Sequence, residues 1–247
     1  MSFANVISMV KEYRSLYGFY SDDLVGDYKR TIERLQKEQR EAIEQLFSSF
    51  GNVLYSELHD FLNHGHEWIA AYDESLASVH GLDFTDLICG VHRLFQDPVV
   101  RERWRSRYSY ISVDEMQDTG VLEYKVLEML WEGNHVLLCG DYFQTIYEWR
   151  GSDPFRLLKQ FDADFKPLKI IFYENYRSNW TLFTMAFKTL QNMFPDLVGS
   201  IYTELPRANS ESKGKPVLIK GCKNSYLEGR YIYEAICALP KDANIGV

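Results

Sequence analysis

Apolar residues recur every three or four positions through the first eighty residues, a spacing that predicts amphipathic helices. One apolar stripe runs from Tyr28 to Phe50, with RLQKEQRE supplying its polar side, and a second runs from Leu54 to Tyr72. The first stripe is too short to favour a coiled coil over packing within the chain. We therefore expect residues 1–80 to form an all-helical subdomain.

From Leu82 onward, helical segments alternate with short apolar runs typical of strands. The expected strands are YISV, HVLLCGD, KPVLIK, NIGV and part of LKIIFYENYRS. The expected helices are DFTDLICGVHRLF, VLEYKVLEMLW, DPFRLLKQF, WTLFTMAFKTLQNMF and YLEGRYIYEAICAL. Alternation of this kind predicts an α/β fold with a parallel sheet. The stretch from Pro195 to Pro216 is rich in Pro, Ser, Asn and Gly, so we expect it to contain a loop.

Two of the expected strands end in acidic residues. YISV leads directly into Asp114 and Glu115, and HVLLCGD ends in Asp141, with Gln144 a short turn later. If both strands belong to one parallel sheet, their carboxyl ends meet at the edge where ligands bind. Oxygen ligands of this kind suit a hydrated Mg²⁺, and a neighbouring glutamate can orient or deprotonate a water molecule. An Asp-Glu pair alone is more often the solvent-exposed end of a strand, so the pair by itself leaves both interpretations open.

Composition narrows the class of protein. Hydrophobic residues make up 46% of the chain and aromatic residues 15%, which is enough for a packed core. The formal net charge of -8 argues against a generally basic nucleic-acid-binding surface, but it allows a local groove that binds bases by stacking. No apolar run approaches the length of a membrane span, and no signal-peptide pattern begins the sequence. We expect a cytoplasmic protein with reduced cysteines and no membrane partner.

Three strings, DEMQDT, GDYFQTIYEWRGSDP and YENYRS, occur in this order along the chain. Together they resemble motifs II, III and IV of superfamily 1 DNA helicases of the UvrD/Rep/PcrA type, with Ser152 where that family usually has alanine. The resemblance is clear from Asp83 to Val247, whereas residues 1–80 only loosely resemble the family's helical 1B insertion. It implies RecA-like sheets of the P-loop NTPase type. Residues 81–165 would be the back half of a first RecA-like domain, and residues 166–247 the start of a second.

The resemblance also implies roles at a bound nucleotide. Asp114 would hold Mg²⁺, and Glu115 would be the general base for the hydrolytic water. Asp141 would belong to the same nucleotide site. Gln144 would contact the γ-phosphate of ATP and report its presence to the DNA side.

Further roles follow for the remaining motif residues. Tyr176 would stack on the adenine, and Arg177 would reach the γ-phosphate as an arginine finger. A planar guanidinium suits the spread charge of a phosphate group. Tyr147, Trp149 and Arg150 would face single-stranded DNA, with Trp149 stacking on a base. An indole face can bind any base without reading sequence.

The sequence lacks other motifs of the family. The only Gly-Lys pair is Gly214-Lys215, and Pro216 follows it, so no Walker A loop of the form G-x-x-x-x-G-K-[ST] is present. Motifs V and VI are also absent, and the strand pattern NIGV runs to the last residue. We expect a middle segment of a helicase that needs the remaining segments of its parent and is inactive alone.

The expected function is that of a fragment of an ATP-dependent DNA helicase or translocase. As the resemblance implies, its parent would couple Mg-ATP hydrolysis to 3′ to 5′ movement on single-stranded DNA, with single-stranded or duplex DNA as its partner, in repair, recombination or replication at the nucleoid. A P-loop-less relative that acts as a DNA- or protein-binding scaffold is the alternative. The missing loop favours the scaffold, and intact Glu115, Gln144 and Arg177 oppose it. A metal-dependent nuclease would explain the acids but not the strings NYRS and QTIYEWRG.

Overall fold

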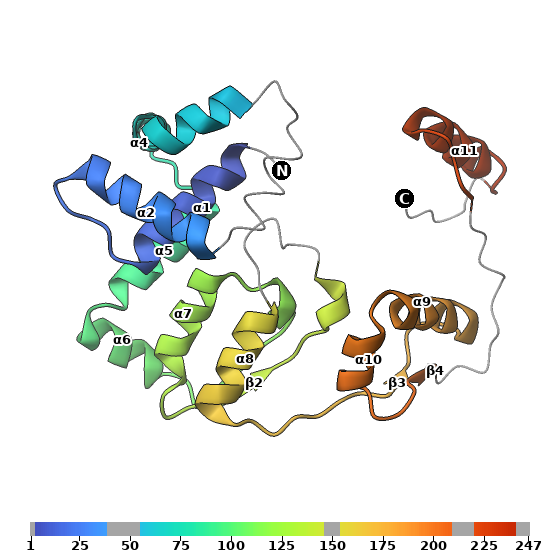
Figure 1. Ribbon diagram of the computed structural model, residues 1–247. Helices are drawn as coiled ribbons and strands as arrows, with labels where there is room; N and C mark the ends of the chain where they lie inside the picture. Colours follow the sequence, from blue (N-terminus) through green and yellow to red (C-terminus); the bar gives the residue numbers. More distant parts are fainter. Residues whose placement is uncertain (1–2, 39–54, 146–153, 209–219, 241–247) are drawn as a thin grey trace. The chain divides into compact units, whose positions relative to one another are not determined.

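The computed structural model describes residues 3–38, 55–145, 154–208 and 220–240 (Figure 1). The chain divides into two compact units, Met1–Pro167 and Leu168–Val247. Both units are mostly helical, and each contains a small two-stranded parallel sheet. The expected parallel pairing of strands is therefore present, in small sheets with shorter strands and more helix than the pattern predicts.

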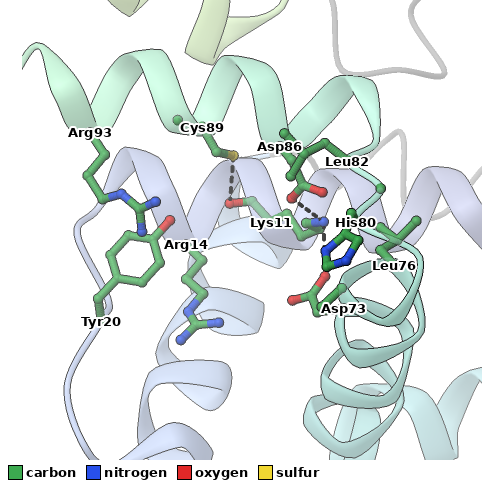
Figure 2. A pocket seen from close by; sticks show the side chains of 13 residues that line it. Lys11, Arg14, Tyr20, Asp73, Leu76, His80, Leu82, Asp86, Cys89 and Arg93 are labelled. Atoms are coloured by element: carbon green, nitrogen blue, oxygen red, sulfur yellow. Dashed lines mark hydrogen bonds and ion pairs between the residues drawn. The ribbon is translucent and has the colours of Figure 1, made fainter.

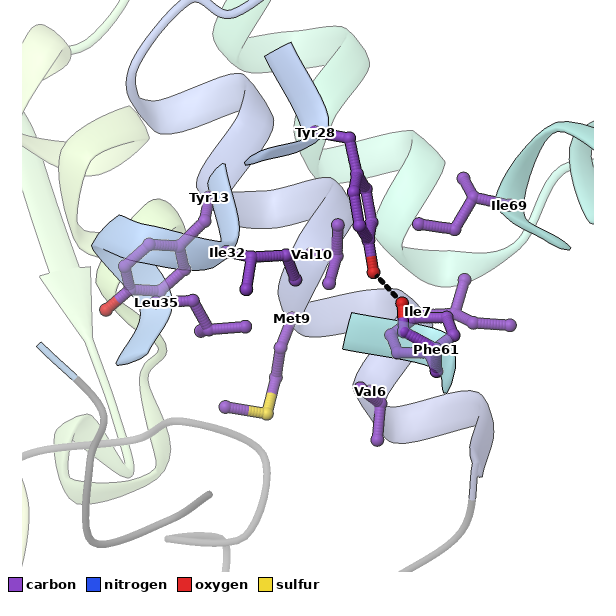
Figure 3. Close-up of a cluster of buried hydrophobic side chains, with 10 residues drawn as sticks. All are labelled: Val6, Ile7, Met9, Val10, Tyr13, Tyr28, Ile32, Leu35, Phe61 and Ile69. Carbon is purple, nitrogen blue, oxygen red and sulfur yellow. Dashed lines mark hydrogen bonds between the residues drawn. The ribbon is translucent and has the colours of Figure 1, made fainter. Parts of the chain in front are cut away.

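The N-terminal part of the first unit contains the helices α1 (Phe3–Leu16), α2 (Leu24–Glu38) and α4 (Tyr55–Ser78). Their apolar stripes meet in one buried cluster (Figure 3), which consists of Val6, Ile7, Met9, Val10, Tyr13, Tyr28, Ile32, Leu35, Phe61 and Ile69. The helices expected from the two stripes are thus confirmed over the described residues. Residues 39–54, which carry the rest of the first stripe, lie outside them.

Tyr28 of α2 and Phe61 of α4 pack so closely around Gly65 of α4 that this position has no room for a side chain. The Tyr28 hydroxyl donates a hydrogen bond to the Phe61 carbonyl oxygen (Figure 3), and the two rings meet edge to face with centroids 6.1 Å apart. Gly65 lies one turn further along α4, where an added Cβ would fall 2.7 Å from carbons of the Phe61 ring and also against the Tyr28 hydroxyl. Glycine is therefore the residue that this contact requires.

Replacing Gly65 by alanine should destabilise the first unit. Because Tyr28 and Phe61 are both buried, neither ring can move aside without disturbing the cluster. We expect the free energy of unfolding to fall by about 1–3 kcal/mol, which urea denaturation can measure. The matched control is Gly90→Ala in helix α5 (Phe84–Leu94), where an added Cβ meets nothing within 4 Å. That change should leave stability equal or raise it by up to about 1 kcal/mol. Equal stability of the two variants would contradict the packing described.

A charged cluster joins α1 to α4 and α5 (Figure 2). Lys11 Nζ lies 3.0 Å from Asp73 Oδ1 and 3.1 Å from Asp83 Oδ2, and it also pairs with Asp86. Asp83 is the N-cap of α5 and forms a reciprocal capping box with Asp86. Burial disfavours the charge of Lys11, but its carboxylate partners outweigh burial and raise its pKa. The segment DFTDL therefore both starts α5 and holds it against the N-terminal helices.

The second half of the first unit is built around two parallel strands, β1 (Tyr110–Val113) and β2 (His135–Leu138). They are connected through α7 (Val121–Trp131), and α6 (Pro98–Arg105) precedes β1 while α8 (Pro154–Phe165) follows the second strand in sequence. A buried cluster lies against one face of this sheet and consists of Met116, Tyr124, Trp131, Leu157 and Phe161. Every second residue of the strands packs on it, namely Ile111 and Val113 of β1 and Val136 and Leu138 of β2. Both strands and the helices expected here are confirmed, so the carboxyl ends of β1 and β2 lie at one edge.

The second unit contains a shorter sheet and more helix than expected. Its elements are β3 (Glu174–Asn175), α9 (Trp180–Met193), α10 (Pro195–Ile201), β4 (Arg207–Ala208) and α11 (Ser225–Cys237). The stretch expected to contain a loop does so after Ile201, and it begins with the unpredicted helix α10, because proline fits the first position of a helix, where its missing N–H is not needed. Residues 215–219 and 244–247, which belong to the last two expected strands, lie outside the described residues.

Candidate functional site

The loops that follow β1 and β2 stay hydrogen-bonded to each other beyond the strands. The Cys139 N–H donates to the Val113 carbonyl oxygen at 2.8 Å, and the Met116 N–H donates back to the Cys139 carbonyl oxygen at 2.9 Å. These bonds hold Asp114 and Glu115 beside the loop that carries Asp141. The expected meeting of the two acidic strand ends at one sheet edge is therefore present.

Glu115 adopts a left-handed backbone conformation, with φ 51° and ψ 41°. This region costs a non-glycine residue on the order of 1 kcal/mol, and such strain is concentrated at functional sites. The short 3₁₀ helix η1 (Met116–Asp118) begins directly afterwards, closed by the Asp118 N–H donating to the Glu115 carbonyl oxygen at 2.9 Å. The turn leaves Asp114 and Glu115 exposed while Met116 is buried.

Gln117 occupies the space between the two loops and is only 2% exposed. Its Nε2 donates to Glu115 Oε2 at 2.6 Å, and its Oε1 accepts from the Asp141 N–H at 2.9 Å. An added Cβ on Gly140 would lie 2.7 Å from Gln117 Oε1, so the approach of the loops depends on glycine at that position. No role for Gln117 was predicted from the sequence, although Gln117 is the fourth residue of the DEMQD motif.

Asp141 organises the turn that presents Gln144. It is the N-cap of the 3₁₀ helix η2 (Tyr142–Gln144), where Asp141 Oδ1 accepts from the Phe143 N–H at 3.0 Å. Asp141 Oδ2 accepts from Gln144 Nε2 at 2.9 Å, and the Gln144 side chain is exposed. Gln144 thus lies on the same loop as Asp141, as expected. The predicted DNA-facing residues Tyr147, Trp149 and Arg150 lie outside the described residues.

The donor set at this edge suits a hydrated metal ion better than an all-protein cage. Within the described ranges, no group of three or more His, Cys, Asp or Glu side chains is placed to hold a metal. Asp114 is exposed, and among the described residues its Oδ1 accepts a hydrogen bond from the neighbouring Glu115 N–H alone, at 3.0 Å. Because Mg²⁺ keeps several waters and needs only one or two carboxylates together with phosphate oxygens, Asp114 fits that ion.

In the second unit, the string NYRSN forms a turn that leads into α9. Asn175 Oδ1 accepts from the Arg177 N–H at 3.1 Å and from the Ser178 N–H at 2.7 Å. Asn179 is the N-cap of α9 and accepts from the Leu182 N–H at 3.0 Å. The two asparagines therefore fix the backbone on either side of the predicted nucleotide-binding residues.

The side chains of Tyr176 and Arg177 lie on the surface of this turn. Tyr176 is 76% exposed, and its hydroxyl donates to Glu174 Oε2 at 2.6 Å. Glu174 in turn pairs with Arg207 of β4 at 2.8 Å. Arg177 is exposed and forms no ion pair with another described residue. An aromatic face and a guanidinium are thus presented together at the start of α9.

In the described segments, no helix combines the length and the apolar character that a membrane span requires.

Comparison with known proteins identifies the family of the chain. The family model of the UvrD/REP helicase N-terminal domain matches residues 10–166. The match includes most of the N-terminal helices, for which the motifs alone indicated only a loose resemblance.

Similar proteins carry the same family names. A probable DNA helicase II homolog of Mycoplasma capricolum is 33% identical over 172 residues, covering 69% of this chain and 23% of the relative. The ATP-dependent DNA helicase Rep of Buchnera aphidicola is 37% identical over 146 residues, 58% of this chain and 22% of the relative. The ATP-dependent DNA helicase PcrA of Staphylococcus aureus is 36% identical over 126 residues, 50% of this chain and 17% of the relative. The chain thus matches about a quarter or less of each relative's length. It belongs to the UvrD/Rep family of DNA helicases.

Proposed function

We propose that this chain is the motif-bearing middle segment of an ATP-dependent DNA helicase or translocase. The observation that carries the proposal is the junction of the DEMQD and GDYFQ loops, which places Glu115 and the Asp141–Gln144 turn at one sheet edge. The fold class proposed for the parent is RecA-like. The proposed division is a helical 1B-like subdomain (1–80), the back of a first RecA-like domain (81–165) and the start of a second (166–247).

At the nucleotide, each residue has a proposed task. Asp114 holds hydrated Mg²⁺, which when bound neutralises charge on the phosphate oxygens. Glu115 accepts a proton from the attacking water, and its carboxylate is exposed at the end of β1 as that task requires. Asp141 orients Gln144 toward the γ-phosphate through their 2.9 Å hydrogen bond. The ATP-dependent relatives Rep and PcrA support the choice of nucleotide.

The second unit contributes the two remaining nucleotide contacts of the proposal. Tyr176 stacks on the adenine through its exposed ring, and Arg177 places a guanidinium on the γ-phosphate. Arginine suits this position because its planar fork matches phosphate oxygens and its charge is permanent. Both residues follow β3, on the turn that the Asn175 side chain fixes.

The proposed DNA contacts are Tyr147, Trp149 and Arg150, which follow Gln144 closely in the sequence. Aromatic stacking and a cation bind a single strand without reading its sequence, which suits a protein that moves along DNA. A change at the γ-phosphate would reach these residues through the short segment that begins at Gln144. The proposed direction is 3′ to 5′, in repair, recombination or replication at the cytoplasmic nucleoid.

Strand displacement tests this function in the longer protein that contains the chain. We expect ATP-dependent release of a labelled strand from a partial duplex with a 3′ single-stranded tail, and little release when the tail is 5′. The second candidate function, a scaffold without ATP chemistry, is favoured by the absence of a G-x-x-x-x-G-K-[ST] string from the printed sequence. Binding of both substrates with no release in the presence of ATP would support the scaffold and contradict the helicase.

A further inference from the structure

Gln117 connects two parts of the site that carry different tasks. The nitrogen of its side-chain amide donates to the carboxylate of Glu115, and the oxygen of the same amide accepts from the backbone N–H of Asp141. Asp141 in turn binds Gln144 through its carboxylate. A continuous path of hydrogen bonds, 2.6 to 2.9 Å long, therefore runs from the proposed general base to the proposed γ-phosphate contact.

The orientation of the Gln117 amide is fixed by its partners. The Asp141 N–H can only donate, so the atom that faces it must be the amide oxygen. The amide nitrogen then faces Glu115 and donates a hydrogen bond to a carboxylate oxygen of that residue. A flipped amide would set donor against donor on one side and oxygen against carboxylate on the other. One side-chain conformation therefore serves both loops.

The surroundings leave Gln117 little freedom to do anything else. Its side chain is buried, and Gly140 lies so close that even a methyl group there would press on the amide oxygen. The Met116 N–H bond to the Cys139 carbonyl oxygen locks the same two loops on the backbone side. A shift of the Asp141 loop must therefore move Gln117, and with it the carboxylate of Glu115.

We propose that Gln117 is a positioning residue that couples the Glu115 carboxylate to the loop of Asp141 and Gln144. The proposal rests on the ATPase role given above to Glu115 and Gln144. In it, Gln117 holds the base at the angle needed for water attack only while the Asp141 loop is in place. Contact of Gln144 with the γ-phosphate then changes the position of the Glu115 carboxylate. Hydrolysis thereby becomes sensitive to whatever moves the loop, including DNA bound at the proposed contacts that follow it in the sequence.

The bridge itself can be tested in the chain as it stands. Amide hydrogen exchange of Asp141, followed by NMR, should quicken by about tenfold in Gln117→Met, because the N–H loses its acceptor. The matched control is Gln96→Met, which removes an exposed glutamine bonded to His92 on α5. Unchanged exchange in Gln117→Met would overturn the bridge.

The positioning role is tested by ATP turnover of the longer protein. Gln117→Met should lower kcat by about 10–100-fold while KM for ATP stays within about twofold, because it removes the donor that holds Glu115. Combining Gln117→Met with Gln144→Ala should cost less than the product of the two single losses, since both break one connection. Gln96→Met should leave kcat unchanged, and thermal melting confirms that each variant is folded.

The outcomes separate this proposal from the function on which it rests. If the unaltered protein turns over no ATP, the proposed function fails, and the exchange measurement still decides whether the bridge exists. If turnover is normal and Gln117→Met keeps its kcat within about twofold, Gln117 is only a structural link and the positioning role is wrong. Fully multiplicative losses in the double variant would contradict the coupling between Glu115 and the Gln144 loop.

Discussion

Replacing Arg177 by alanine in the longer protein is expected to lower kcat for ATP hydrolysis by on the order of 10³-fold or more. Negative charge spreads over the phosphate oxygens as the γ-phosphoryl group is transferred, and a guanidinium that reaches those oxygens stabilises the transition state more than the ground state. Arg177 is exposed at the start of α9, and its ordered backbone donates to Asn175 Oδ1 at 3.1 Å. Its side chain can therefore be removed without disturbing the turn.

Two variants make the result specific. Arg177→Lys keeps the charge but not the planar fork, so its kcat should remain far below that of the unaltered protein. Arg230→Ala removes an exposed arginine of α11 that pairs with Glu234 at 2.8 Å, and kcat should stay within about twofold. Melting curves of all variants should coincide closely. Near-normal turnover in Arg177→Ala would rule out the arginine-finger role.

The second large effect is expected for Glu115→Gln, which should lower kcat by about 10²–10⁴-fold and leave ATP binding intact. The amide has nearly the same shape as the carboxylate but cannot accept the proton of the attacking water. Its oxygen can still accept the 2.6 Å hydrogen bond from Gln117 Nε2, so the loop should keep its conformation. The change therefore removes the chemistry and little else.

The matched control is Glu132→Gln, which neutralises an exposed carboxylate that pairs with Arg105 after α7. An exposed ion pair contributes little to stability, so both stability and turnover should be nearly unchanged. Steady-state kinetics with saturating ATP and single-stranded DNA measure kcat, and nucleotide binding is measured separately by titration. A Glu115→Gln variant that hydrolyses ATP at close to the normal rate would move the general base to another residue.

The hydrophobic pattern predicted the helices and strands of the first unit well, because each predicted strand has a neighbouring strand to pair with and each predicted helix has an apolar surface to pack on. YISV and HVLLCGD pair in register through β1 and β2, and the apolar faces of α7 and α8 cover one side of the strands. Once the strands are parallel neighbours, their topology brings Asp114 and Asp141 to one edge. The amide bridge of Gln117 was not predictable, because a hydrogen bond across two loops leaves no periodic signal in the sequence.

The second unit shows that an apolar run does not fix the length of a strand. The strand expected within LKIIFYENYRS is present but short, because among the described residues only Glu174 and Asn175 pair, with Arg207 and Ala208. Ile170 and Phe172 remain 71% and 84% exposed. A strand forms only where the backbone of a neighbouring strand is available for hydrogen bonding, and β4 consists of two residues. The helix α10 was not predicted. A stretch that contains Pro and Gly indicates a loop, and the sequence alone does not show that Pro195 occupies the first position of a helix.

We propose that this chain carries the base and phosphate-contact motifs of a DNA-driven ATPase whose phosphate loop is supplied by other segments. The most direct measurement is steady-state ATP turnover of the longer protein and of the isolated 247-residue chain, each with and without single-stranded DNA. We predict turnover that DNA stimulates in the longer protein and no useful turnover in the chain alone, because the triphosphate there has no phosphate loop. Absence of any ATP turnover in the longer protein, or robust turnover by the isolated chain, would contradict the account.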